Sequence, residues 1–97
     1  RTPVLVDGFI SAAAALCAVR LCPAAGDYLL ASHVSAEPAG QMLLDALGLT
    51  PFLRAGMCLG EGTGAAAVMP LLDMALAVYD GMATFEDIQV EAYQPLT

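Results

Sequence analysis

Three short apolar runs constrain the fold of this chain most, because a polar loop and then a longer Ala- and Leu-rich segment follow each of them. The runs span residues 3–6, 28–31 and 57–59. Their length and apolar character predict buried strands. Strands that alternate with helices form βαβ units, whose strands are parallel. We therefore predict an α/β fold of the Rossmann-like three-layer type, with a parallel sheet and flanking helices.

The segments between the runs predict helices. Residues 9–22 are nearly apolar on all sides and stop before Pro23, so we expect a helix that is buried on most faces. Pro38 suits the first turn of a second helix, which ends at Leu47 before Gly48. Residues 51–55 are predicted to form a short connector or a helical turn.

A third helix is expected from Gly62 to about Tyr79. Proline removes one backbone hydrogen bond, so we expect a kink or a break at Pro70. A transmembrane span is the rival interpretation, which Pro70, Asp73 and the many Ala and Gly residues disfavour. Beyond this helix, residues 84–87 resemble an N-cap that opens a last short turn, and residues 91–97 resemble a tail.

Composition limits the partners of the chain. Its 97 residues are 59% hydrophobic, which is high for a free-standing domain of this size, so we expect another part of a longer protein to cover it. Lys is absent, and three Arg stand against ten Asp and Glu, for a net charge of -7. Nucleic-acid binding needs clustered cations and is therefore disfavoured. No secretion signal is visible, and we expect a cytoplasmic protein.

The cysteines do not predict a disulfide or a metal site. On one helix, Cys17 and Cys22 would be separated by about 7.5 Å of rise and about 140° of rotation, which a disulfide cannot bridge. We expect buried thiols in a reducing compartment. The only histidine, His33, has no recognised metal-ligand spacing with Cys17, Cys22 or Cys58, so we predict neither a metal nor a cofactor.

Three polar loops follow the predicted strands, at residues 7–8, 32–37 and 60–64. In open parallel sheets, ligands bind beyond the carboxyl ends of the strands, where these loops would meet. The last loop, Gly-Glu-Gly-Thr-Gly, precedes a helix and is suited to bring backbone amides against an anion. Because a carboxylate repels phosphate, Glu61 is expected to face the reacting part of a ligand.

Other interpretations of these loops remain open. Residues 60–65 also fit a loose dinucleotide fingerprint, but Asp80, at the required distance, ends a helix rather than a strand. The Lys and Ser/Thr of a P-loop are also missing, and a plain tight turn is a further alternative.

The loop at residues 32–37 contains Ser32, His33 and Ser35, which could suggest a nucleophile and a base. Adjacent residues in a strand point to opposite faces, however, and no G-x-S-x-G elbow is present. Hydroxyls that bind an anion, or that cap the next helix, fit better. Asp7 either orients a ligand hydroxyl or caps the helix that starts near Phe9.

Three blocks of the sequence resemble consecutive blocks of the nicotinate-nucleotide:dimethylbenzimidazole phosphoribosyltransferase family. They are VLVDGFIS at residues 4–11, ASHVSAEP at 31–38 and LGEGTGAA at 59–66, and residues 82–85 resemble the family's ending. The resemblance covers nearly all of this chain. It implies that residues 1–97 are the C-terminal part of a single α/β phosphoribosyltransferase domain.

The resemblance implies transfer of phosphoribose from nicotinate mononucleotide to dimethylbenzimidazole, which gives α-ribazole phosphate and nicotinate in cobalamin synthesis. It also implies a homodimer, an N-terminal part that supplies most of the binding pocket, and Glu61 as the catalytic base. Substrate contact is expected from seven residues: Gly60, Gly62, Thr63, Gly64, Ser32, Ser35 and Asp7. The alternatives are a non-catalytic nucleotide-binding or assembly module and another nucleotide-binding α/β enzyme.

This chemistry agrees with the residues. A pyridinium leaving group departs from the anomeric carbon without an acid, whereas the attacking benzimidazole must lose its ring proton, which calls for one carboxylate base.

Overall fold

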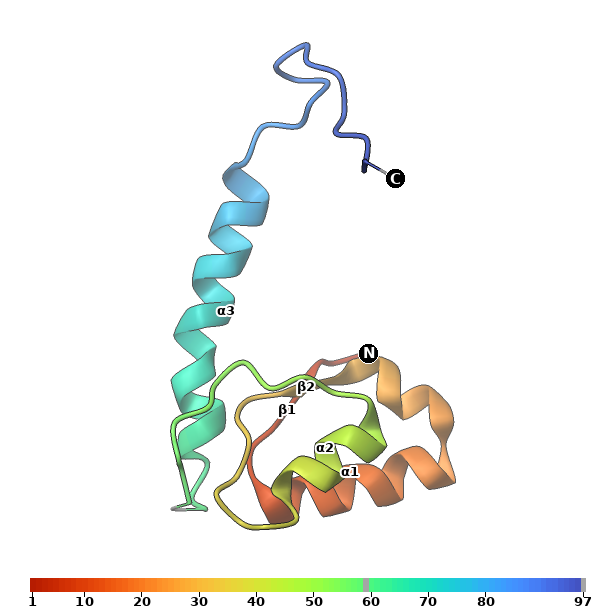
Figure 1. Ribbon diagram of the computed structural model, residues 1–97, viewed down its shortest axis with the longest axis vertical. Coiled ribbons are helices and arrows are strands. Elements are labelled where there is room, and N and C mark those ends of the chain that lie inside the picture. The colour runs from red at the N-terminus through yellow and green to blue at the C-terminus, as the bar shows by residue number, and fades with distance from the viewer. Residues whose placement is uncertain (59, 97) are drawn as a thin grey trace.

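A computed structural model of the chain describes residues 1–58 and 60–96, and it contains the predicted order strand, helix, strand, helix up to its second strand and the helix after it (Figure 1). Their order is β1 (Val4–Val6), α1 (Phe9–Leu21), the 3-10 helix η1 (Pro23–Tyr28), β2 (Leu29–Ala31), α2 (Gly40–Leu47) and α3 (Thr63–Gly81). The strands β1 and β2 pair in parallel, with Val4 opposite Leu29 and Val6 opposite Ala31. The predicted parallel α/β architecture is therefore confirmed.

The third position of the sheet, beside β2, is taken by the stretch at residues 51–55. Leu53 forms a parallel bridge with His33. Its amide donates to the Ser32 carbonyl at 3.0 Å, and its carbonyl accepts the Val34 amide at 3.2 Å. Residues 51–55 are thus a connector, as expected, with a single bridge to the sheet rather than a helical turn, and so short a run carries too little periodicity to predict that bridge.

The strand predicted at residues 57–59 is wrong for Met57 and Cys58, and Leu59 lies outside the described residues. Gly56 has φ = +62°, which turns the chain away from a strand direction just before Met57. The Met57 carbonyl instead accepts the Ala36 amide at 3.2 Å. This bond ties the loop after β2 to the segment that leads into α3.

The core lies between the sheet, α1 and α2. Val6, Ala12 and Ala15 form its centre, and four leucines pack around them: Leu29, Leu43, Leu47 and Leu49. Only this side of α1 is covered, since Ile10 is 82% exposed and Leu21 is 88% exposed. The expected burial of α1 on most faces is wrong here, because the described elements pack against one side of it.

The helix α2 begins at Gly40, two residues after Pro38, and ends at Leu47 as predicted. Its C-cap, Gly48, adopts the left-handed conformation, with φ = +68°. A Cβ atom on Gly40 would lie 2.8 Å from the Ser35 carbonyl oxygen, so glycine lets α2 approach the loop after β2 closely.

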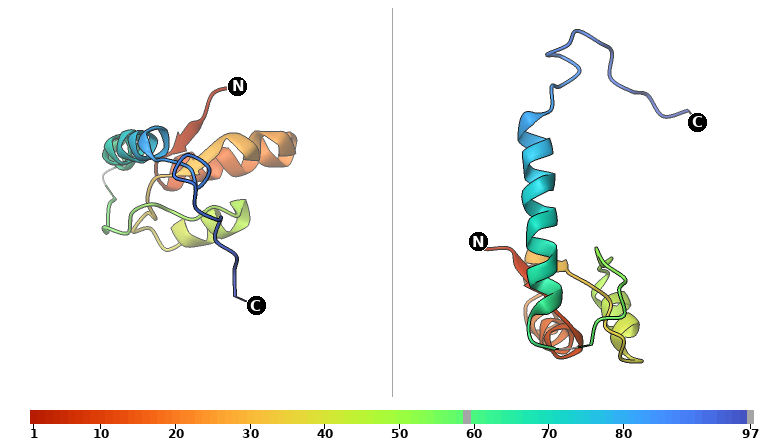
Figure 2. Two further views of the ribbon diagram at one scale, coloured as in Figure 1. Left: turned by 90° about the horizontal axis from the view of Figure 1, so that it is seen from above. Right: turned by 90° about the vertical axis from the view of Figure 1, so that its left-hand side faces the viewer.

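The helix α3 runs through Pro70 without interruption, so the expected break is wrong. Residues 66 and 70 both lie on the exposed side of the helix, where water can bond the carbonyl that Pro70 leaves free. Gly64 and Val68 pack inward, and the rest of α3 projects away from the sheet (Figures 1 and 2). By length and composition alone, α3 could also cross a membrane.

The chain after α3 contains the predicted capped turn. The Thr84 amide donates to Asp87 Oδ2 at 2.8 Å, and the Asp87 amide donates to Thr84 Oγ1 at 3.1 Å. These two bonds form a reciprocal cap. Residues 91–96 have no regular structure, as expected for a tail.

The three cysteines, Cys17, Cys22 and Cys58, are free, but all are exposed, so the predicted burial of the thiols is wrong. Cys17 lies on the open side of α1, and Cys22 follows the end of that helix. Both cysteines are exposed because the described elements pack against only one side of α1.

Candidate active site

The loop after β1 and the loop before α3 are joined by the Asp7 carboxylate. Asp7 Oδ2 accepts the Gly62 amide at 3.1 Å, and Oδ1 accepts the Ala65 amide at 3.0 Å. The loop after β2 meets the same place, because Ser32 Oγ lies 2.9 Å from the Asp7 carbonyl oxygen. The three loops therefore converge as predicted at the carboxyl ends of β1 and β2, although the third loop does not follow a strand.

Asp7 caps α3 rather than α1. The N-cap of α1 is Gly8, and among the described residues no side chain caps that helix. A carboxylate at a helix N-terminus is stabilised by the unpaired amides and by the helix dipole. The glycine loop was expected to hold an anion. At the amides of Gly62 and Ala65, that anion is the carboxylate of the protein's own Asp7. Sequence reasoning could not find these two bonds, because the residues that each of them joins lie more than 50 positions apart.

Ser32 is fully buried, and its hydroxyl bonds inside the protein. Its Oγ lies 2.8 Å from the Val6 carbonyl oxygen and 3.1 Å from His33 Nδ1. This arrangement gives Ser32 the role of tying the ends of β1 and β2 together, and it leaves no free hydroxyl for a ligand. The side chains of Ser32 and His33 were expected to point apart, as those of neighbours in a strand do. Because β2 ends at Ala31, both residues lie beyond this strand, and their side chains meet.

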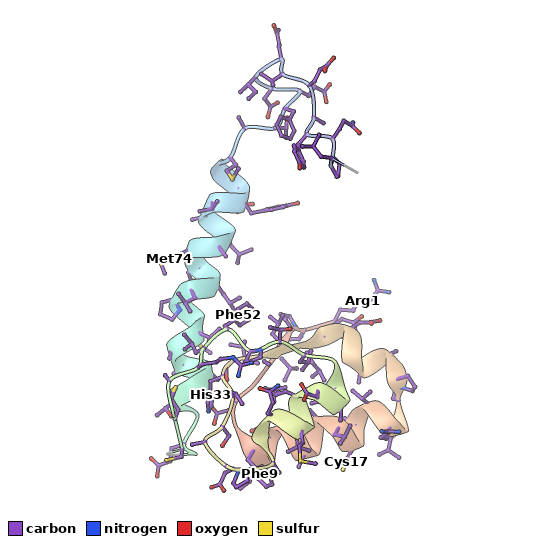
Figure 3. All side chains as sticks on the ribbon, viewed as in Figure 1. Arg1, Phe9, Cys17, His33, Phe52 and Met74 are labelled. Carbon is purple, nitrogen blue, oxygen red and sulfur yellow. The ribbon has the colours of Figure 1, made fainter. Side chains whose placement is uncertain are left out.

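His33 was considered as a base in the sequence but was not among the predicted site residues. Its side chain is only 6% exposed and lies beside the first turn of α3 (Figure 3). A Cβ atom on Gly64 would overlap the imidazole ring, and one on Gly8 would lie within 4 Å of it. The available signal was a lone histidine in a polar loop at a strand end.

A cavity of about 330 Å³ opens where the three loops meet. Ten residues line it: Asp7, Gly8, Phe9, Ile10, Ser11, His33, Ser35, Glu37, Cys58 and Gly60. Two carboxylates and no Lys or Arg are among them. Its lining therefore suits a neutral or cationic group better than a phosphate.

Glu61 directly follows Gly60, the cavity-lining glycine of the third loop. Gly60 and Gly62 have φ values of +75° and +77°, so left-handed glycines flank the glutamate on both sides. Glu61 itself is exposed, and Thr63 begins α3. Glu61 thus stands on a sharply turned loop next to a residue that lines the cavity but is not itself part of the lining, and Asp7 fixes the amide that follows it.

Ser35 also lines the cavity, and its hydroxyl accepts the Glu37 amide at 3.2 Å. This bond stabilises the turn before α2, but it does not cap that helix, whose N-cap, Ala39, makes no side-chain cap bond, so the expected capping of α2 by a loop hydroxyl is wrong. Within residues 1–58 and 60–96, no group of three or more His, Cys, Asp or Glu side chains is placed to hold a metal ion.

The sequence matches a family model described as phosphoribosyltransferase over residues 1–90. It is 50% identical over 95 residues to the nicotinate-nucleotide:dimethylbenzimidazole phosphoribosyltransferase of Acetivibrio thermocellus, covering 98% of this chain and 27% of the relative. The protein of that name from Chromobacterium violaceum is 53% identical over 88 residues, which cover 91% of this chain and 26% of the relative.

A crystal structure of nicotinate-nucleotide:dimethylbenzimidazole phosphoribosyltransferase from Thermus thermophilus has the same fold in the matched region. The TM-score is 0.83 at 44% sequence identity, over 94% of this chain and 27% of that chain. The chain therefore spans about a quarter of the length of the relatives it matches.

Proposed function

This chain belongs to the nicotinate-nucleotide:dimethylbenzimidazole phosphoribosyltransferase family, and we propose that its full-length protein transfers phosphoribose from nicotinate mononucleotide to dimethylbenzimidazole. The products are α-ribazole phosphate and nicotinate, and the reaction serves the nucleotide loop of cobalamin. The full-length protein acts in the cytoplasm as a homodimer, and its remaining sequence completes the substrate pocket.

One observation carries this proposal: Glu61 stands between two left-handed glycines beside the cavity where the three loops meet. In the reaction, one benzimidazole nitrogen attacks the anomeric carbon while the bond to the nicotinate nitrogen breaks. The other benzimidazole nitrogen must lose its proton. Glu61 accepts that proton as general base, which typically contributes about 10² to 10⁴-fold to the rate.

The acidic lining supports one assignment of the substrates to this cavity. Asp7 and Glu37 would repel a phosphate in the cavity, and Asp7 already bonds two amides of the α3 N-terminus. We assign the uncharged groups at the reacting centre to this cavity. The phosphate is then held mainly by the part of the protein outside this chain, with Thr63 and Gly64 at the edge of the site.

The direct test uses the full-length protein with nicotinate mononucleotide and dimethylbenzimidazole. We expect α-ribazole phosphate and nicotinate to form in equal amounts, as measured by liquid chromatography with mass detection. A reaction without dimethylbenzimidazole is the control and should release no comparable nicotinate. Binding of the nucleotide without product would instead identify a non-catalytic binding module and would contradict the proposed activity.

A further inference from the structure

The hydrogen bonds of Ser32 determine where His33 carries its proton. Ser32 Oγ has one hydrogen and lies within 2.9 Å of two carbonyl oxygens, those of Val6 and Asp7. If that hydrogen pointed at His33 Nδ1 instead, the lone pairs of Oγ would face both carbonyl oxygens at close range. The hydroxyl therefore donates to a carbonyl, and Nδ1 donates its hydrogen to Ser32 Oγ across 3.1 Å.

In the imidazole form of the ring, this assignment leaves the lone pair on Nε2. Nε2 lies on the side of the ring that faces Gly8, which lines the cavity together with His33. Within the described part of the chain, Nε2 has no protein partner, and no buried side-chain nitrogen or oxygen is left unsatisfied. Nε2 is therefore accessible from the cavity and is a free hydrogen-bond acceptor there.

We propose that His33 is a substrate-binding residue whose Nε2 accepts a hydrogen bond from an uncharged donor of the bound substrate. This inference rests on the proposed function, which supplies two donors of that class: a ribose hydroxyl of the nucleotide and the ring N-H of the benzimidazole. The acidic lining agrees with it, because Asp7 and Glu37 favour groups that carry hydrogen-bond donors and disfavour anions. Ser32 acts as the positioning residue that fixes the ring.

Two variants of the full-length protein separate binding from structure. His33→Asn places an amide nitrogen near the position of Nδ1, so it keeps the bond to Ser32 and removes the acceptor in the cavity. His33→Gln places its amide near the position of Nε2, so it keeps an acceptor in the cavity and loses the bond to Ser32. Calorimetric titration with nicotinate mononucleotide and, separately, with dimethylbenzimidazole measures binding without turnover.

We expect His33→Asn to weaken the binding of one substrate about threefold to tenfold, the value of one neutral hydrogen bond, with a smaller drop in melting temperature than in His33→Gln. His33→Gln should bind more tightly than His33→Asn and melt at a lower temperature. A loss confined to the nucleotide identifies a ribose hydroxyl as the donor, and a loss confined to the base identifies the ring N-H.

The inference is overturned if His33→Asn binds both substrates like the wild type, or if affinity follows melting temperature in both variants. Either result would leave His33 with a structural role only. Wild-type protein that binds neither substrate would contradict the proposed function as well. Because these titrations do not depend on proton transfer, a failure of Glu61 as the base would not affect them.

Discussion

Gly64 has no room for a side chain, because the His33 imidazole occupies the place of its Cβ atom. We expect Gly64→Ala to destabilise the full-length protein by about 1 to 3 kcal/mol, since overpacking forces the ring or the helix to move. This cost exceeds the gain of about 1 kcal/mol that alanine brings inside a helix. Thermal unfolding followed by circular dichroism measures the difference.

Gly81, at the end of the same helix, is the matched control for that substitution. A Cβ atom there meets nothing within 4 Å, so Gly81→Ala should leave the unfolding temperature unchanged or raise it slightly. If Gly64→Ala were as stable as Gly81→Ala, the close approach of α3 to His33 would be wrong.

Asp7 contributes to stability through the α3 N-terminus. Asp7→Ala removes the acceptor of two amides, and we expect a loss of about 0.5 to 2 kcal/mol, the range of an N-cap substitution. Asp7→Asn keeps one acceptor oxygen and should lose less. Urea unfolding of the full-length protein checks the order wild type, Asn, Ala.

Asp27 is the control for Asp7, because it is exposed in η1 and its side chain makes no hydrogen bond within the described residues. Asp27→Ala should have little effect. An equal loss at both positions would show that net charge, rather than the cap on α3, determines the result.

At the residue scale, the sequence predicts those features whose cause is local. The glycines around Glu61 indicate a sharp loop, and two of them do adopt positive φ. The partners of Asp7, Ser32 and His33 come from distant segments, so no local pattern reveals them. The prediction that Glu61 is the base stays a prediction until activity is measured.

At the element scale, the turn after α3 should respond to acid. The backbone and side-chain bonds of Thr84 lower the pKa of Asp87. Because the pKa of Asp87 is lower in the folded turn than in the unfolded chain, the charged carboxylate stabilises the turn at any pH above the pKa of the unfolded chain. This stabilisation is lost as the pH falls through the pKa that Asp87 has in the folded turn. We expect the Thr84 amide resonance to hold its position from neutral pH to about pH 4 and to shift only below that pH.

Asp87→Asn is the matched variant for this titration, because it keeps an oxygen acceptor but does not ionise. Its Thr84 amide should show no acid transition in the same range. A transition that persisted in Asp87→Asn would mean that another group titrates there, and the reciprocal cap would not explain the pKa of Asp87.

The elements differ in how well their sequences predict them. The end of α2 and the capped turn depend on local residues, Gly48 and Thr84, and both predictions are confirmed. The third strand position depends on which short segment pairs with β2, and that is decided by contacts across the sheet rather than by Leu53 itself. The break predicted at Pro70 fails for a similar reason, since water can satisfy the freed carbonyl on the exposed side of α3.

At the scale of the whole molecule, the chain exposes more surface than a compact protein of its mass. Its accessible surface is 7198 Å², whereas about 5,200 Å² is typical for 9.9 kDa. Its radius of gyration is 16.6 Å, against about 12.5 Å for a compact domain of this length. The helix α3 alone exposes six large apolar side chains: Met69, Leu71, Met74, Leu76, Val78 and Tyr79.

We therefore expect the 97-residue chain on its own to associate with itself. An exposed apolar helix favours association, and so does the edge of β1 that pairs with no other strand among the described residues. Analytical ultracentrifugation should show oligomers, and an apolar dye should bind strongly. Adding the remainder of the full-length protein should suppress both signals. A dilute, stable monomer that binds no dye would refute this expectation.

The central claim is that Glu61 is the base, and the kinetics of Glu61→Gln in the full-length protein test it most directly. Glutamine keeps the size of the side chain but removes its basicity, so kcat should fall about 10² to 10⁴-fold while the affinity for nicotinate mononucleotide stays nearly the same. Glu86→Gln, in the turn after α3, is the control and should keep wild-type kcat. A Glu61→Gln protein with wild-type kcat would contradict the claim.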